Sequence, residues 1–144
     1  MSQVIVYTNI SGNVSVCYPT GEIPIEVVLA KDCPAGAVII DSTELPQGTD
    51  ADFQSAWVLN QSTITVSISK AQEQQTNTLN QLVYNESAHR AVKTLSGLDN
   101  VLNDADWKAL VSNSQFAIAT ATTTTELVAA IAPVQAAIVA NSAV

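Results

Sequence analysis

Residues 57–83, WVLNQSTITVSISKAQEQQTNTLNQLV, decide the fold because the sequence pattern changes within them. Up to Ser69, apolar and hydroxyl side chains alternate, which is typical of an antiparallel strand with one face in solvent. From Lys70 onward Gln, Asn and Thr predominate, and the apolar residues that remain fall near helical spacing. The sequence therefore predicts an α+β fold: a small antiparallel sheet domain over residues 1–69, then a helical region over residues 70–144.

The sheet domain is expected to contain about five strands and two short helices. The strands are predicted at residues 3–8, 14–18 and 37–41, and in a hairpin over residues 57–69 that turns around Asn60-Gln61-Ser62. The short helices are predicted at residues 24–31 and 50–57. In the second of these, Phe53, Ala56 and Trp57 fall on one face, which indicates that this face packs into the core.

Three helices are expected in the second half, at residues 70–96, 103–121 and 124–140. Gly97 is a natural C-terminal cap for the first helix, and Asn103 is a natural N-terminal cap for the second. Thr123 and Glu126 have the spacing of a capping box at the start of the third. Pro133 is expected to kink or divide that last helix, because proline removes a backbone hydrogen bond.

The composition argues against several partners. Hydrophobic residues make up 47% of the 144 residues, charged residues make up 12%, and the formal net charge is −8. This profile suits a folded protein rather than a disordered chain. Five Lys and Arg against thirteen acids supply no basic stripe, so we expect no nucleic-acid partner. An acidic surface also disfavours binding to anionic lipid.

The first residues, MSQVIVYTN, lack the basic and apolar regions of a secretory signal, and no stretch approaches the length of a membrane-spanning helix. We therefore expect a soluble protein without a membrane partner, made in a reducing cytoplasm. In that compartment Cys17 and Cys33 are expected to be small buried hydrophobic residues. A disulfide or a metal site is a distant second interpretation.

Residues suited to catalysis or metal binding are few. His89 is the one histidine, and no second histidine completes a metal site. The pairs Asp50/Asp52 and Asp104/Asp106 lie where helices are expected to begin, so helix capping explains them better than Mg²⁺ or Ca²⁺ binding. No nucleophile is paired with a base. We expect no catalytic residue, no metal and no cofactor.

The amide-rich helix is the strongest candidate for a partner surface. A helix that is polar all round is either a solvated connector or a helix whose amides meet other chains, and the sequence leaves both interpretations open. The residues expected at such an interface are Gln74, Gln75, Asn77, Asn80, Gln81, Tyr84 and Trp107. The apolar segment 127–140 is expected to pack on Trp107 and Phe116, or in an oligomer.

Residues 1–71 resemble the small tail and tail-fibre assembly proteins of tailed bacteriophages. The segments that carry the resemblance are IEVVLAKDCPAG (25–36), Asp41, Leu45-Pro46, FQSAW (53–57) and Lys70-Ala71. The resemblance implies a small N-terminal domain before C-terminal helices, with Pro34, Phe53 and Trp57 in the structural core and no catalytic residues. Such proteins often carry a basic helix after the Lys-Ala pair, where this sequence has Gln and Asn.

The sequence thus predicts a non-enzymatic protein of tail or tail-fibre assembly, which binds a fibre or other tail protein as a chaperone does. It would work in the host cytoplasm during assembly or remain in the virion tail, alone or as a homo-oligomer. One alternative is a permanent virion subunit at the fibre tip, baseplate or capsid surface. A second is a small glycan-active enzyme, which needs paired carboxylates in one cleft.

Overall fold

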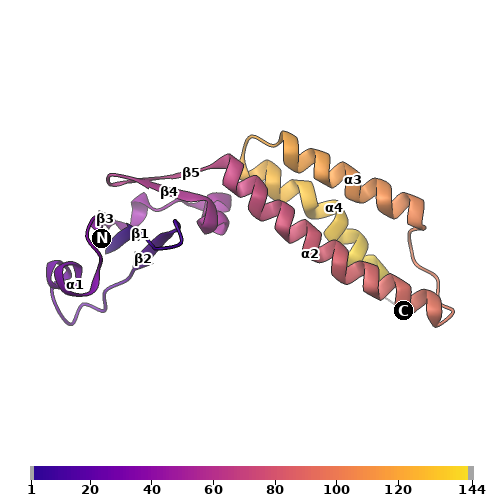
Figure 1. The fold of residues 1–144 in the computed structure, drawn as a ribbon, viewed down its shortest axis with the longest axis horizontal. Helices are drawn as coiled ribbons and strands as arrows, with labels where there is room; N and C mark the ends of the chain where they lie inside the picture. The colour runs from indigo at the N-terminus through magenta and orange to yellow at the C-terminus, as the bar shows by residue number, and fades with distance from the viewer. Residues whose placement is uncertain (1, 143–144) are drawn as a thin grey trace. The chain divides into compact units, whose positions relative to one another are not determined.

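A computed structural model describes residues 2–142 and confirms the α+β fold class (Figure 1). The chain divides into two compact units, residues 1–70 and 71–144. The elements of the first part are β1 (Gln3–Thr8), β2 (Val14–Cys17), α1 (Ile25–Asp32), β3 (Val38–Asp41), the 3-10 helices η1 (Ser42–Glu44) and η2 (Gly48–Ala56), β4 (Trp57–Asn60) and β5 (Thr63–Val66). The helices that follow are α2 (Ile68–Leu95), α3 (Asp104–Thr120) and α4 (Thr124–Ser142).

The strands form two antiparallel sheets. β1 is the central strand of a three-stranded sheet in the order β2-β1-β3, and β4 and β5 form a separate hairpin. The hairpin turns at Gln61, whose φ of 57° lies in the left-handed region that a tight turn requires. This is the turn that the sequence predicted.

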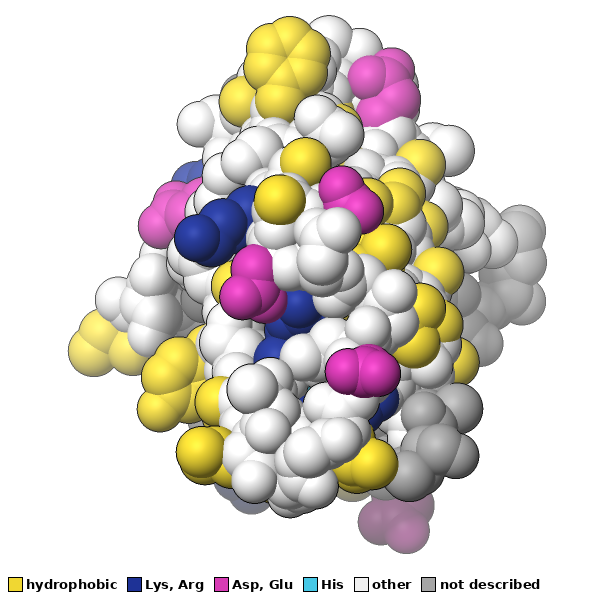
Figure 2. Space-filling view, turned by 90° about the vertical axis from the view of Figure 1, so that its right-hand side faces the viewer, with side chains coloured by type: hydrophobic (Ala, Val, Ile, Leu, Met, Phe, Trp, Pro, Cys, Tyr) yellow, Lys and Arg dark blue, Asp and Glu magenta, His cyan; other side chains and the backbone are white. Residues whose placement is uncertain are grey.

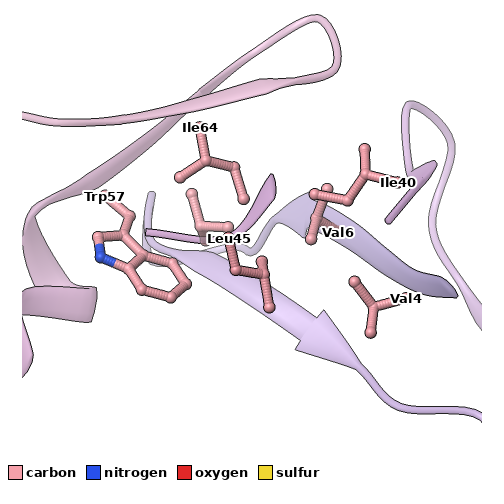
Figure 3. Close-up of a cluster of buried hydrophobic side chains, with 7 residues drawn as sticks. Val4, Val6, Ile40, Leu45, Trp57 and Ile64 are labelled. Carbon is pink, nitrogen blue, oxygen red and sulfur yellow. The ribbon is translucent and has the colours of Figure 1, made fainter. Parts of the chain in front are cut away.

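The core of the sheet unit lies between the three-stranded sheet and the hairpin (Figure 3). Its buried members are Val4, Val6, Val14, Ile40, Leu45, Trp57 and Ile64. Trp57 is 5% exposed, and its indole Nε1 donates to the carbonyl of Asp50 at 2.9 Å, so its polar atom is satisfied as well. Phe53 and Ala56 are also buried, which confirms the predicted inward face of that helix.

Two expectations for the sheet unit were wrong. Pro34 is exposed and is not part of the core, because it stops α1 and its carbonyl accepts the amide of Ala37 in a surface turn. The last strand ends at Val66 instead of reaching Ser69, and Ile68 is already helical. The reason is local: Ser67 Oγ accepts the backbone N–H of Lys70 at 3.3 Å, as a helix N-cap does.

The helix ends follow the predicted capping residues. Gly97 has a φ of 77°, and the amide of Leu98 donates to the carbonyl of Lys93, which is a Schellman ending for α2. Asn103 Oδ1 accepts the amide of Asp106 at 2.8 Å at the start of α3.

The start and middle of α4 differ in detail from the sequence expectation. Thr123 Oγ1 accepts the amide of Glu126 at 3.1 Å, but the Glu126 carboxylate reaches Thr122 instead of closing a capping box on Thr123. α4 runs unbroken from Thr124 to Ser142 with Pro133 inside it, so the proline does not divide the helix.

By length and composition, α4 would be able to cross a membrane, so the expectation that no stretch approaches that length was wrong. In the structure α4 packs against α3, with Leu127, Ala130, Ile131 and Val134 buried. Phe116 of α3 is 71% exposed, so it does not cover the apolar residues of α4 as expected from the sequence. The absence of a membrane partner stays a prediction.

Candidate functional site

The inward face of α2 is mostly polar. Its buried residues are Ala71, Gln75, Leu79, Glu86, Arg90 and Lys93. They are spaced by three, four or seven residues along the chain, so they form one stripe on the helix. A stripe of this composition cannot hold three helices together by the hydrophobic effect alone, so the contacts of its polar members decide how α2 is attached.

At the N-terminal end of α2, glutamine amides donate to main-chain carbonyls. Gln75 Nε2 donates to the carbonyl of Leu127 at 2.8 Å, and Gln72 Nε2 donates to that of Ala121 at 3.0 Å. Ala121 is the C-cap of α3, where carbonyls have no partner within the helix. These amides therefore join α2 to the C-cap of α3 and to the beginning of α4.

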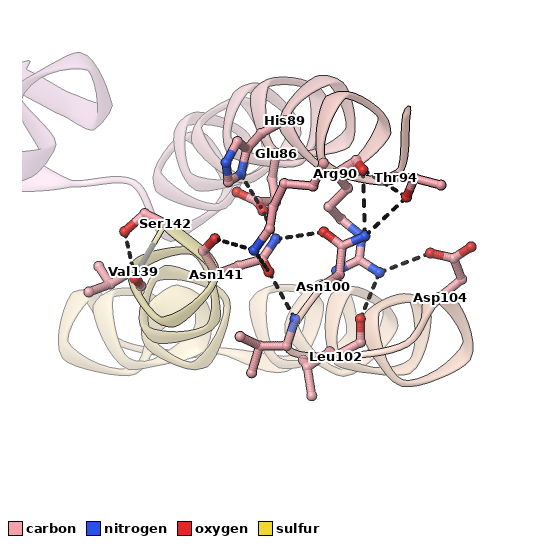
Figure 4. A network of polar contacts seen from close by, with 12 residues as sticks. Glu86, His89, Arg90, Thr94, Asn100, Leu102, Asp104, Val139, Asn141 and Ser142 are labelled. Atoms are coloured by element: carbon pink, nitrogen blue, oxygen red, sulfur yellow. Dashed lines mark hydrogen bonds and ion pairs between the residues drawn. The ribbon is translucent and has the colours of Figure 1, made fainter. Parts of the chain in front are cut away.

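At the other end of α2, a buried network is centred on Asn141 and is called here the Asn141 clasp (Figure 4). The Asn141 amide donates to Glu86 Oε1 at 2.7 Å and to Asn100 Oδ1 at 3.0 Å. Asn141 Oδ1 accepts from Lys93 Nζ at 3.1 Å and from the amide of Val101 at 2.9 Å. The hydrogen-bonding capacity of this side chain is thereby used in full.

Beside the clasp, Arg90 holds the loop between α2 and α3. Its side chain is 7% exposed. Its Nη2 atom donates both to the carbonyl of Leu102 at 2.8 Å and to Asp104 Oδ1 at 2.9 Å. The guanidinium carbon lies 5.4 Å from the ring centroid of Trp107, within cation–π range. The hydrogen bond from Arg90 and its charge hold the pKa of Asp104 below the ordinary value of 3.8.

A groove of about 930 Å³ opens between α2 and α3. Its apolar lining is Val83, Ala91, Leu95, Trp107 and Val111, and its charged lining is Arg90, Asp104 and Lys108. Trp107 is 7% exposed, so it forms part of the wall and does not project into solvent. The other lining residues are uncharged and polar: Ser87, Thr94, Asn100, Ser112 and Gln115. The groove therefore combines an apolar surface with polar groups, as ligand and peptide sites do.

A second, more polar hollow of about 700 Å³ lies at the loop between α2 and α3. Arg90 lines it together with Asp99, Asp104 and Asp106. Figure 2 faces this end of the helical unit and shows acidic side chains around a hollow in which basic side chains lie. Because Arg90 is already paired with Asp104, the hollow is part of the structure that holds the loop.

The structure separates the residues expected at a partner interface. Gln75 is buried and its amide is used within the helical unit, so we remove it from the candidate interface. Trp107 is 7% exposed and stays a candidate only as part of the groove wall. Gln74 is half-buried and already has an interaction partner. The exposed remainder on α2 is Asn77, Asn80, Gln81 and Tyr84, and Tyr84 is 75% exposed.

The acidic pairs considered for chemistry have structural roles where contacts are described. Asp104 is paired with Arg90, and Asp106 lies in the first turn of α3, where its backbone amide donates to the N-cap Asn103. Among residues 2–142, no three His, Cys, Asp or Glu side chains are grouped so that they would hold a metal ion. His89 lies at the edge of the clasp, with its Nδ1 atom 3.2 Å from Glu86 Oε1. The expectation of no enzymatic activity stays a prediction.

The clasp residues were missed by sequence reasoning, which treated α2 as polar on all sides. One signal was present: Glu86, Arg90 and Lys93 are spaced so that they share a helix face. No family model, no curated protein and no solved structure matches this chain.

Proposed function

We propose that this protein is a non-enzymatic assembly protein of a bacteriophage tail or tail fibre, which holds a segment of a tail protein in the groove between α2 and α3. The resemblance of residues 1–71 to tail-fibre assembly proteins supports the setting. The groove of about 930 Å³ in the helical unit, with its five apolar lining residues, supports the mode of action and is the observation that carries the proposal.

An amphipathic helix is the occupant that suits this groove. Two helices form its walls, and a third helix would lay an apolar face on Val111 and Leu95 as helices do in grooves of this kind. Arg90 and Lys108 outnumber Asp104 in the lining, in a chain whose net charge is −8. Because Asp104 is paired with Arg90, the Lys108 ammonium favours an acidic residue on the bound helix.

Such binding would assist assembly through mass action. A fibre subunit that has not yet assembled exposes apolar helical surface, which favours aggregation. A protein that covers this surface lowers the concentration of the exposed state and leaves when the subunits bind each other more tightly. This action needs no catalytic group.

The test is co-expression with the tail and tail-fibre proteins encoded beside this protein, followed by co-purification and mass measurement of the complex. The groove variant is Ala91→Arg, which places a long charged side chain in the groove. Its matched control is Ala88→Arg, one turn earlier on the exposed surface of α2 and outside the groove lining.

The proposal expects a tail protein to co-purify with wild type and with Ala88→Arg, and its yield to fall at least tenfold with Ala91→Arg, a loss of about 1.4 kcal/mol. If the tail protein co-purifies equally well with both variants, the groove is not its binding site. If no tail or fibre protein co-purifies with the wild type, the assembly function is refuted.

A permanent virion subunit is the second candidate, and the outer face of α2 favours it. Asn77, Asn80, Gln81 and Tyr84 are exposed there, and uncharged amides of this kind suit contacts between subunits. Quantifying the protein in purified virions separates the candidates. A fixed stoichiometry in the particle supports a subunit, and its absence from the particle supports a released assembly protein.

A further inference from the structure

Cys17 lies on a defined face of the three-stranded sheet, as the strand register shows. Cys17 is directly opposite Ile5, and Ile5 is directly opposite Ile39, so these side chains point to one side of the sheet. Ile5 is completely buried yet lies outside the core cluster that contains Val4 and Val6. Another part of the chain must therefore pack on this second face of the sheet and bury Ile5.

Helix α1 supplies that cover. It contacts β1 and β3, and its Val28 is buried without belonging to the core cluster on the other face. Cys33 is the C-cap of α1, with extended backbone angles. The Cys17 side chain thus faces the side of the sheet that α1 covers, and Cys33 ends α1, although fifteen residues separate the two cysteines in the chain.

The two thiols are free and each cysteine is half-buried, where the sequence predicted buried residues. The Cys17 thiol is close enough to Cys33 to act on its ionisation. The pKa of Cys33 is raised by burial, by the neighbouring Cys17 thiol and by the Asp32 carboxylate. Oxidation of these two thiols, with the loss of two electrons and two protons, would join them in a disulfide.

We propose that Cys17 and Cys33 are a modification site that reacts with low-molecular-weight disulfides to form an intramolecular disulfide between the end of β2 and the end of α1. One thiolate attacks the disulfide reagent, forms a mixed disulfide and releases one reagent thiolate. The second thiolate then attacks the protein sulfur of that mixed disulfide and releases the other reagent thiolate. The protein loses two electrons and two protons, and the reagent disulfide is reduced to two thiols.

The disulfide would close a loop that contains the whole of α1. A cross-link of this loop length restricts the unfolded chain and so raises the stability of the sheet unit. The pair would stay reduced in a cytoplasm and become oxidised once the protein meets an oxidising medium. This inference concerns the sheet unit and is independent of the groove and of its occupant.

The test treats the folded full-length protein with oxidised glutathione and measures the intact mass under denaturing conditions. We expect the loss of two hydrogen atoms without a lasting glutathione adduct, and a proteolytic peptide that links Cys17 to Cys33. The midpoint of thermal unfolding should rise by on the order of 10 °C, and dithiothreitol should reverse the shift.

Single and double variants serve as controls. Cys17→Ser and Cys33→Ser should each stop at the glutathione adduct of the remaining cysteine. The double variant Cys17→Ala/Cys33→Ala should show the same thermal midpoint with and without oxidant, which separates the disulfide from any other effect of the reagent. Two free thiols after treatment, two glutathione adducts, or disulfide-linked dimers of the wild type would each overturn the proposal.

Discussion

Lys93 and Asn141, 48 residues apart in the chain, are joined by two hydrogen bonds: Lys93 Nζ donates to both the side-chain oxygen and the carbonyl of Asn141, each at 3.1 Å. Both side chains are buried. The C-terminal end of α2 is therefore held to the last turn of α4 by an ammonium group and an amide, at a position where most helix bundles place apolar residues.

Replacing Asn141 with Leu should destabilise the protein by about 2–3 kcal/mol, because Lys93 and Glu86 would keep their burial and lose their partner. Urea denaturation followed by circular dichroism measures the loss. The matched control is Asn113→Leu on the exposed surface of α3, which should stay within about 0.5 kcal/mol of wild type. Equal effects of the two substitutions would show that the clasp contributes nothing.

Replacing Arg90 with Lys should loosen the loop between α2 and α3. A lysine ammonium cannot reproduce the planar contacts to Leu102, Asp104 and the Trp107 ring, and about 1–3 kcal/mol of stability should be lost. Hydrogen exchange of the amides in residues 97–103 measures the effect and should become faster. Lys108→Arg, which keeps the charge at an exposed position, is the control and should leave exchange unchanged.

The ion pair of Arg90 and Asp104 should respond to acid. Arg90 lowers the pKa of Asp104 in the folded protein, so the pair stabilises the fold above the unfolded pKa, near 3.8, and the contribution disappears as pH falls through the lower folded value. The difference in stability between wild type and Asp104→Asn should thus be present at pH 7 and fade at pH values below about 4.

Urea titrations of both proteins at neutral and acidic pH measure this difference. Asp106→Asn is the control, since Asp106 shares the first turn of α3 while the Arg90 hydrogen bond goes to Asp104. A difference between wild type and Asp104→Asn that is the same at both pH values would contradict the predicted contribution of the ion pair.

Ser114 is a local weakness of the helical unit. It is 2% exposed, and its Oγ is the buried side-chain atom that lacks a hydrogen-bond partner among residues 2–142. Ser114→Ala removes an unsatisfied hydroxyl and should raise stability by about 1 kcal/mol more than Ser112→Ala, an exposed change on the same helix with the same gain in helix propensity. Thermal unfolding of both variants checks the order, and equal stabilities would contradict it.

Much of the architecture was predictable because the signals are local. Gly97, Asn103 and Gln61 mark their turns and caps through contacts within a few residues, so these ends were placed from the sequence. Local chemistry also explains two errors. The Ser67 cap starts α2 earlier than the strand pattern indicated, and Pro34 serves as a stop signal on the surface.

The groove was not predictable, because the pattern of α2 did not show which side faces inward. Gln75 had been expected to meet another chain, yet its amide donates to Leu127 within the same unit. Trp107 was expected at an interface and lines the groove, with the Arg90 guanidinium carbon 5.4 Å from its ring centroid. For Gln75, the backbone carbonyl of Leu127 made burial of a polar side chain possible.

The sequence by itself determined the fold class and the approximate ends of the helices and strands, since apolar periodicity and capping act over one or two turns of chain. Tertiary structure alone decided which polar side chains hold the helices together. The partners of Gln75 and Lys93 lie 52 and 48 residues further along the chain, at distances that no local pattern encodes. A polar side chain can be buried only where such a partner satisfies it, and that pairing exists only in the folded unit.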